Sequence, residues 1–107
     1  MDTVSNYTKT LEKTVRDLLE RQDDLIRTAF TDQLTGLGNR GGFARSLEEL
    51  WEQNAPVTMA FIDIDNLKHC NDVFGHDEGN RYILQVSLYL KLYMKVDEAA
   101  FRIGGDE

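Results

Sequence analysis

The chain has 107 residues, of which 41% are hydrophobic and 29% charged, and its formal net charge is −7 at pH 7. This length permits one small folded domain with an appendage. The acidic balance excludes a nonspecific coat for a nucleic-acid polymer, which needs clustered Lys and Arg, but it allows a local nucleotide site. No apolar run is long enough to span a bilayer, and no signal-peptide pattern follows Met1. The single cysteine, Cys70, excludes an internal disulfide and a multi-cysteine zinc site, so we expect a reducing, cytoplasmic setting.

Residues 1–30 contain no Gly or Pro and carry a seven-residue repeat. The d positions of this repeat are Val4, Leu11, Leu18 and Leu25, and the a positions are Thr8, Val15, Gln22 and Ala29. Leucine at d with β-branched residues at a favours a parallel two-stranded coiled coil, in which a polar Gln22 would fix the register at a cost in stability. The alternative is a single amphipathic helix packed on its own domain, because the stretch barely reaches the length that a heptad assignment needs.

The four glycines within residues 31–42 predict a break in the helix and a structured turn. We expect Asp32, Asn39 and Arg40 to organise this turn between a stalk of residues 1–30 and a domain of residues 31–107. The periodicity then predicts a helix over about 42–53, ended by the only proline, with an apolar face of Phe43, Leu47, Leu50 and Trp51.

The second half of the domain alternates short apolar runs with helical patterns. Residues 57–62 are almost continuously apolar and predict a buried strand, and residues 99–103 predict a second, short strand. A short helix is expected over 66–73 and a longer one over about 78–95, whose apolar face is formed by Ile83, Val86, Leu90 and either Tyr93 or Met94.

Acidic residues follow the first predicted strand, at the position where open α/β sheets bind ligands. Asp63 and Asp65 are not expected to share one ion. A carboxylate from another strand has to join one of them, and Asp106 is the obvious candidate. Hard oxygen ligands of this kind suit Mg²⁺. Solvated acids at a strand end are the alternative interpretation of Asp-x-Asp alone.

Three motifs follow one another along the chain. The first is Asp32-Gln-Leu-Thr-Gly-Leu-Gly-Asn39-Arg40, and the last is Arg102-Ile-Gly-Gly-Asp-Glu107. Between them, residues 61–80 carry a lysine, an asparagine and a histidine after the predicted strand. Lysine binds phosphate as a point charge, and asparagine carries a donor and an acceptor for a base edge. Over residues 32–107 the chain strongly resembles the GGDEF family of diguanylate cyclases. Residues 1–30 resemble the signalling helix that often precedes such domains.

The resemblance implies an α/β (α+β) fold of the nucleotidyl-cyclase type, with a central β-sheet flanked by helices, of which residues 31–107 form the first half. It also implies a homodimer, held here through the N-terminal helix, that condenses two GTP molecules into cyclic di-GMP and pyrophosphate with Mg²⁺ or Mn²⁺. In this family the 3′-hydroxyl of one GTP attacks the α-phosphate of the other. The expected setting is bacterial signalling.

The resemblance also implies a role for individual residues. Metal would be held by Asp63, the backbone carbonyl of Ile64 and Asp106, with Glu107 as an accessory acid. Asp106 would help to remove the proton of the 3′-hydroxyl, and Lys68 would stabilise phosphate charge. The expected substrate-binding residues are Asn71, His76, Asn80, Gly104 and Gly105, with Asn71 and Asn80 reading guanine. For Lys68 an ordinary surface position, and for His76 a role in closing the turn after Gly75, are the alternatives.

The chain departs from the family pattern in three ways, of which Asn80 and the incomplete domain favour a rival interpretation, while the retained Gly104-Gly105-Asp106-Glu107 and Asp63 favour the enzyme. Asn80 stands where the family has Asp, and Lys95-Val96-Asp97-Glu98 stands where many members have the Arg-x-x-Asp of a product-inhibition site. The family's domain also continues beyond residue 107. The rival is a weak or inactive GGDEF module that binds nucleotide or mediates dimerisation, and a third possibility is a coiled-coil adaptor. We expect residues 1–107 alone to be inactive.

Overall fold

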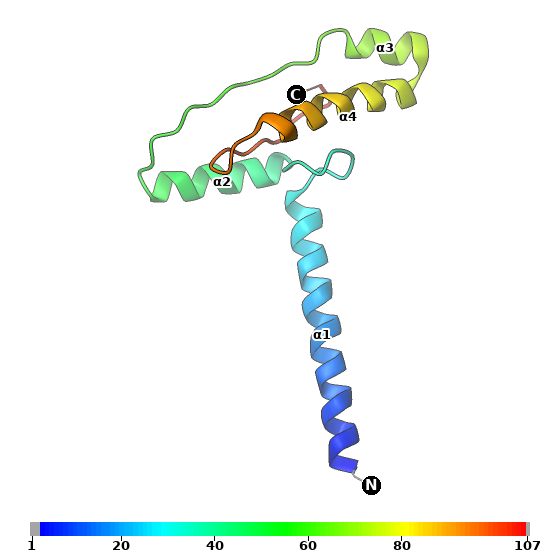
Figure 1. The fold of residues 1–107 in the computed structure, drawn as a ribbon, viewed down its shortest axis with the longest axis vertical. Helices are drawn as coiled ribbons and strands as arrows, with labels where there is room; N and C mark the ends of the chain where they lie inside the picture. Colours follow the sequence, from blue (N-terminus) through cyan, green and yellow to red (C-terminus); the bar gives the residue numbers. More distant parts are fainter. Residues whose placement is uncertain (1–2, 107) are drawn as a thin grey trace.

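The computed structural model describes residues 3–106, so the predicted accessory acid Glu107 lies outside the described residues. Four helices follow one another along the chain: α1 (Thr3–Phe30), α2 (Arg40–Glu52), α3 (Leu67–Phe74) and α4 (His76–Tyr93). Figure 1 shows α1 projecting as a stalk away from the other three helices. The radius of gyration is 20.1 Å, whereas a compact chain of this length would have about 13 Å.

Helix α1 confirms the helix predicted over residues 1–30 and makes no contact that buries any of its side chains. Its apolar residues are exposed instead: Leu18 is 57% exposed and Leu25 is 71% exposed. The alternative in which this helix packs on its own domain is therefore wrong for the described residues. The apolar seam of α1 remains available to a partner.

Helices α2, α3 and α4 confirm the helices predicted over 42–53, 66–73 and 78–95, with boundaries that differ by up to two residues. Leu67 and Ile83 are buried and form the small core together with Leu37. Trp51, which was expected on the apolar face of α2, is 84% exposed. It lies in the last turn of α2, immediately before the chain leaves the helix, so no described segment covers it.

The predicted central sheet is not formed by the described residues. Residues 57–62 are extended but have no strand partner, and Phe61, expected in a buried strand, is 71% exposed. Figure 1 shows this segment running from the end of α2 to the start of α3. Within 99–103, pairing is limited to one parallel bridge between Phe101 and Gly38, which also bridges Thr31. Extended segments become a sheet only where neighbouring strands satisfy their backbone groups.

An apolar cavity of about 930 Å³ occupies the place where the sheet was predicted. Its wall is made by the inner faces of α2 and α4 and by the extended residues 56–62 and 99–103. Phe43 of α2 has edge-on ring contacts with Phe61 and Phe101, at centroid distances of 6.5 and 5.5 Å. The apolar faces predicted for α2 and α4 thus point inward, toward an incompletely filled interior.

A tight elbow joins α1 to α2. The side chain of Asn39 accepts a hydrogen bond from the Gly42 backbone N–H at 2.9 Å, and its Nδ2 donates to the Ala29 carbonyl at 2.9 Å. A Cβ atom at Gly42 would lie 2.5 Å from the Phe30 carbonyl oxygen, so only glycine allows this approach. The Arg45 guanidinium lies 4.7 Å from the centre of the Phe30 ring.

Candidate active site

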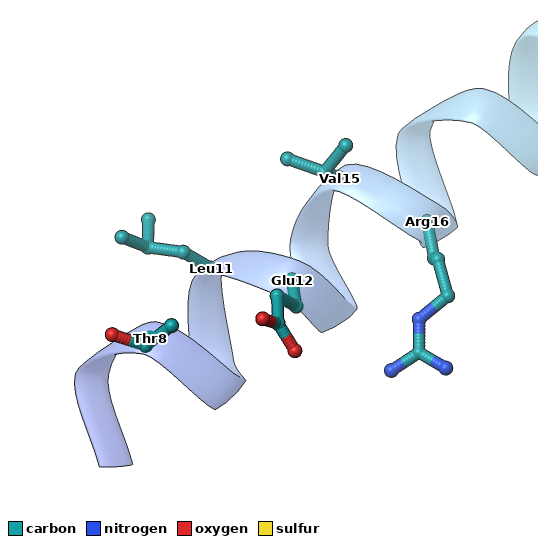
Figure 2. Close-up of a pocket in the computed structure, with 5 residues that line it drawn as sticks. All are labelled: Thr8, Leu11, Glu12, Val15 and Arg16. Carbon is teal, nitrogen blue, oxygen red and sulfur yellow. The ribbon is translucent and has the colours of Figure 1, made fainter. Parts of the chain in front are cut away.

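The stalk presents a shallow groove on α1 that is lined by Thr8, Leu11, Glu12, Val15 and Arg16. Figure 2 shows Thr8, Leu11 and Val15 along one side of the helix, while Glu12 and Arg16 extend from the adjoining side. Thr8, Leu11 and Val15 are successive a and d positions of the predicted repeat. An apolar line flanked by charged side chains is the arrangement of a coiled-coil seam.

The turn after the stalk is organised by Asp32, as the sequence predicted. Its Oδ2 accepts hydrogen bonds from the Thr35 backbone N–H at 2.9 Å and from the Thr35 hydroxyl at 2.7 Å. Its Oδ1 lies 3.3 Å from Nη1 of Arg102, 70 residues further along the chain. Both side chains of this ion pair are largely shielded from solvent, with exposed fractions of 18% and 21%.

The environment of Asp32 changes its acidity. Partial burial acts to raise the pKa of this carboxyl, but the two hydrogen bonds from Thr35 and the positive charge of Arg102 outweigh it, and the pKa falls below its ordinary value. Asp32 is therefore a permanent anion near neutral pH. It ties the start of the domain to the segment that precedes the Gly-Gly-Asp-Glu motif.

Arg102 continues this connection into the motif itself. Its Nη2 donates a hydrogen bond to the Gly105 carbonyl at 3.1 Å, while its backbone N–H donates to the Gly38 carbonyl at 2.8 Å. Lys91 of α4 donates from Nζ to the Thr35 carbonyl and so holds the same turn from the other side. The turn, α4 and the Gly-Gly-Asp-Glu loop are thus joined by polar contacts.

The segments that carry the predicted metal ligands meet where the extended residues approach this loop. The Ile64 backbone N–H donates a hydrogen bond of 2.8 Å to the Asp106 carbonyl. This bond places the Asp63–Ile64 pair beside Asp106, although the two segments are more than 40 residues apart in sequence. Asp63 is exposed, and Ile64 and Asp106 are half-buried.

The oxygen donors carried by these two segments are of the type that could hold a magnesium ion together with substrate phosphates. No group of three or more His, Cys, Asp or Glu side chains that could hold a metal occurs among residues 3–106. Mg²⁺, however, is often held by one or two carboxylates, with water and substrate phosphates completing its coordination. Two carboxylates and a carbonyl oxygen near one backbone hydrogen bond are a donor set of that kind.

The predicted nucleotide-binding residues lie on α3 and α4, which pack against each other. Asn71 is half-buried on α3, and its Oδ1 is buried without a hydrogen-bond partner among the described residues. Asn80 is exposed on α4. Lys68, in the first turn of α3, and His76, which opens α4, are both exposed. The two asparagines are brought to one helix pair, whereas Lys68 and His76 extend into solvent.

The glycines of the loop leave its backbone open. A Cβ atom at Gly105 would meet nothing within 4 Å, and Gly104 is half-buried. A backbone without side chains in open space allows close approach of an anionic ligand. The open space around Gly105 is compatible with the phosphate-side position that the resemblance implied for it.

Sequence reasoning missed the residues that hold the site together rather than line it. Arg102 was seen only as the first residue of a motif, and Lys91 only as one position of a helix. Their partners are 70 and 56 residues away in sequence, so no local pattern reveals these contacts. The only available signal was that each is a cation in an otherwise acidic chain.

Comparison with solved structures shows which class of protein has this fold. A crystal structure of the coiled coil and GGDEF domain of DgcB from Caulobacter crescentus, in complex with c-di-GMP, matches with a TM-score of 0.77 and 26% identity. The match covers 96% of this chain and 56% of that one. A helical stalk joined to GGDEF-type structure is therefore the architecture of residues 3–106.

The sequence comparisons agree with this class. Residues 29–107 match the family described as diguanylate cyclase, GGDEF domain, and the chain belongs to the GGDEF family. It is 39% identical over 100 residues to the diguanylate cyclase DgcP of Escherichia coli, and 37% identical over 89 residues to the response regulator PleD of Caulobacter vibrioides. These matches cover 90% and 79% of this chain but only 29% and 20% of the two relatives.

Proposed function

We propose that this chain provides the metal-binding and guanine-binding part of a diguanylate cyclase that joins two GTP molecules into cyclic di-GMP and pyrophosphate. The observation that supports the proposal is the backbone hydrogen bond from Ile64 to Asp106, because it joins the two segments that carry the predicted carboxylate ligands. The names of the relatives and the family match support the same activity.

In this proposal the residues divide the chemistry between them. Asp63, the Ile64 carbonyl and Asp106 hold Mg²⁺ or Mn²⁺, which when bound polarises the phosphate. Asp106 takes the proton of the 3′-hydroxyl, and Lys68 offsets negative charge on the phosphates. Asn71 and Asn80 contact guanine, His76 contacts the nucleotide, and the open backbone at Gly104 and Gly105 lets the phosphates approach. Positioning and charge neutralisation account for most of the acceleration in transfers of this kind.

The reaction needs two such sites that face each other, so we propose a homodimer formed through the seam of α1. Three facts support this partner: the a and d side chains of α1 are exposed, the groove around Leu11 and Val15 is apolar, and a relative of known structure carries a coiled coil before its GGDEF domain. No described helix is long and apolar enough to cross a membrane.

A second candidate function is nucleotide binding with little or no turnover. It is favoured by Asn80, which offers a single acceptor oxygen where the family's Asp offers a carboxylate to the N1–H and 2-amino group of guanine. A hydrogen bond to a charged group contributes about 1.5–3 kcal/mol. Binding of GTP would then be roughly ten- to hundredfold weaker than with Asp at this position.

The metal assignment is tested in a chimera in which this chain is followed by the part of DgcP that lies beyond the matched region. We expect Asp63→Asn to abolish formation of cyclic di-GMP while circular dichroism and thermal unfolding remain unchanged, because one negative ligand is lost where phosphate charge must be neutralised. Asp17→Asn, which makes the same change on the exposed stalk, is the control. Turnover of the Asp63→Asn chimera at the unmodified rate would overturn the assignment.

A further inference from the structure

Where α3 packs against α4, a side chain of α3 fills the space beside the Cα atom of Gly79. Gly79 lies in the first turn of α4 and is buried. A Cβ atom built on Gly79 would collide with Oδ1 of Asn71 and would lie 2.7 Å from its Cγ and 3.3 Å from its Nδ2. All three atoms belong to the terminal amide of a single side chain. The Asn71 amide therefore occupies the space that a side chain at position 79 would need, and we call this space the seat.

The seat holds the Asn71 amide without a polar contact. Oδ1 of Asn71 is buried against α4 and accepts no hydrogen bond from the described residues. An unsatisfied buried acceptor destabilises the folded state, so folding alone does not favour this arrangement. The arrangement does restrict the amide, because its three terminal atoms occupy the space that a side chain at position 79 would need.

We infer that Gly79 is a positioning residue for guanine recognition: it holds the Asn71 amide and sets the spacing between Asn71 on α3 and Asn80 on α4. The inference deepens the proposed function and rests on it, since it takes Asn71 and Asn80 as the residues that read guanine. Gly79 itself touches no ligand in this account. It acts through the packing of α3 against α4.

A methyl group at position 79 should move Asn71 without unfolding the chain. The atoms that collide are the far end of a flexible side chain, which can rotate into another rotamer, and α4 gains helix propensity when Ala replaces Gly. The substitution should therefore change the orientation of the Asn71 amide rather than the stability of the fold. Recognition of guanine should weaken, while contacts to ribose and phosphates should persist.

The test compares four forms of the 107-residue chain with the unmodified chain: Gly79→Ala, Asn71→Ala, the double variant, and Asp77→Ala. Asp77→Ala is the control, because it places the same side chain in the same turn of α4 but adds no atom near Asn71. Two quantities are measured: the NMR signals of the Asn71 side-chain amide without ligand, and the dissociation constants for GTP and ATP in Mg²⁺.

We expect Gly79→Ala to shift the Asn71 amide signals and to weaken GTP binding about tenfold, with ATP binding unchanged. The double variant should bind GTP as Asn71→Ala does, because Gly79 acts only through Asn71. The control should match the unmodified chain in both measurements.

The two ways of failing are distinguishable. Unchanged Asn71 signals in Gly79→Ala, or losses that add in the double variant, would overturn the inference while leaving the proposed function intact. Absence of GTP binding by the unmodified chain would overturn the proposed function and the guanine role of Gly79 with it. In that case shifted amide signals would still establish the seat as a purely structural contact.

Discussion

Asp32 connects three parts of the chain through one carboxylate: the end of the stalk, the Thr35 turn and Arg102 beside the Gly-Gly-Asp-Glu loop. Its pKa is lowered from the ordinary value of 3.8, since the hydrogen bonds and the cation outweigh the effect of partial burial. A lowered pKa in the folded state means that the ionised form stabilises the fold. This contribution is complete above the unfolded-state pKa and is lost as the pH falls through the folded-state pKa.

We therefore expect Asp32→Asn to lower the free energy of unfolding by about 1–2 kcal/mol at pH 6–8. The difference from the unmodified chain should begin to shrink as the pH falls below about 4 and should vanish once the pH has passed through the lowered folded-state pKa, because Asp32 is then neutral like the amide. Urea unfolding across this pH range measures it. Asp24→Asn, at an exposed ion pair with Arg27, should show almost no difference at any pH. An Asp32→Asn difference that stays constant down to pH 2 would contradict the assigned role.

Asn80 provides a second test at the scale of one residue. Asn80→Asp restores a charged acceptor for the guanine N1–H and 2-amino groups and should tighten GTP binding ten- to hundredfold. The measurement is a calorimetric titration with GTP in Mg²⁺. Gln85→Glu adds the same charge elsewhere on α4 and should leave the affinity unchanged. Equal or weaker binding by Asn80→Asp would show that residue 80 does not contact guanine in this way.

At the scale of single residues, the sequence predicted some positions well and others not at all. Asp32 and Asn39 were identified from turn chemistry, because short polar side chains bond to nearby backbone groups. Trp51 was misplaced, since periodicity finds the face of a helix but not the point at which its neighbours end. The seat at Gly79 was not predicted, because the contact depends on how two helices approach each other.

Among the elements, α1 yields the clearest prediction. Replacing Leu18 with Lys puts a charge at the centre of the seam and should convert the chain from dimer to monomer. Sedimentation equilibrium at tens of micromolar measures the change. Thr10→Lys adds the same charge at an exposed position outside the a and d set and should leave the dimer intact. A monomeric unmodified chain at this concentration would refute the seam.

The four helices could be predicted, and the sheet could not, for one physical reason. A helix satisfies its backbone hydrogen bonds internally, so an apolar stripe and end signals are enough to indicate it. A strand depends on a partner that its own sequence does not specify. Residues 57–62 have the composition of a buried strand, yet in the described structure they lie extended, exposed and unpaired. The same limit applies to residues 99–103, where pairing is reduced to the bridge at Phe101.

At the scale of the whole molecule, the 930 Å³ cavity determines what the chain can do alone. The apolar faces of α2 and α4 line a cavity rather than pack on a sheet. Without a sheet beneath it, the proposed site cannot keep its ligands within the narrow limits that transfer between two nucleotides needs.

We expect residues 1–107 to form no cyclic di-GMP from GTP and Mg²⁺, whereas the chimera extended with the following part of DgcP should form it. Chromatographic detection of the product in both reactions, at equal protein concentration, makes the comparison. The Asp63→Asn chimera gives the background. Product from the short chain at a rate near that of the chimera would show that our account of the site is wrong.

The elbow at Asn39 and Gly42 has a mechanical consequence. Helix α1 has 28 residues, which at 1.5 Å per residue make a lever about 42 Å long. A tilt of about 5° at the elbow would move the far end by roughly 4 Å, less than one helical turn. Read in the other direction, a displacement of a few ångströms at the far end reaches the elbow as a small rotation. Because Gly42 lies so close to the Phe30 carbonyl, the two helices cannot move freely against each other at the elbow. The rotation is therefore transmitted to α2 and to the Asp32 turn.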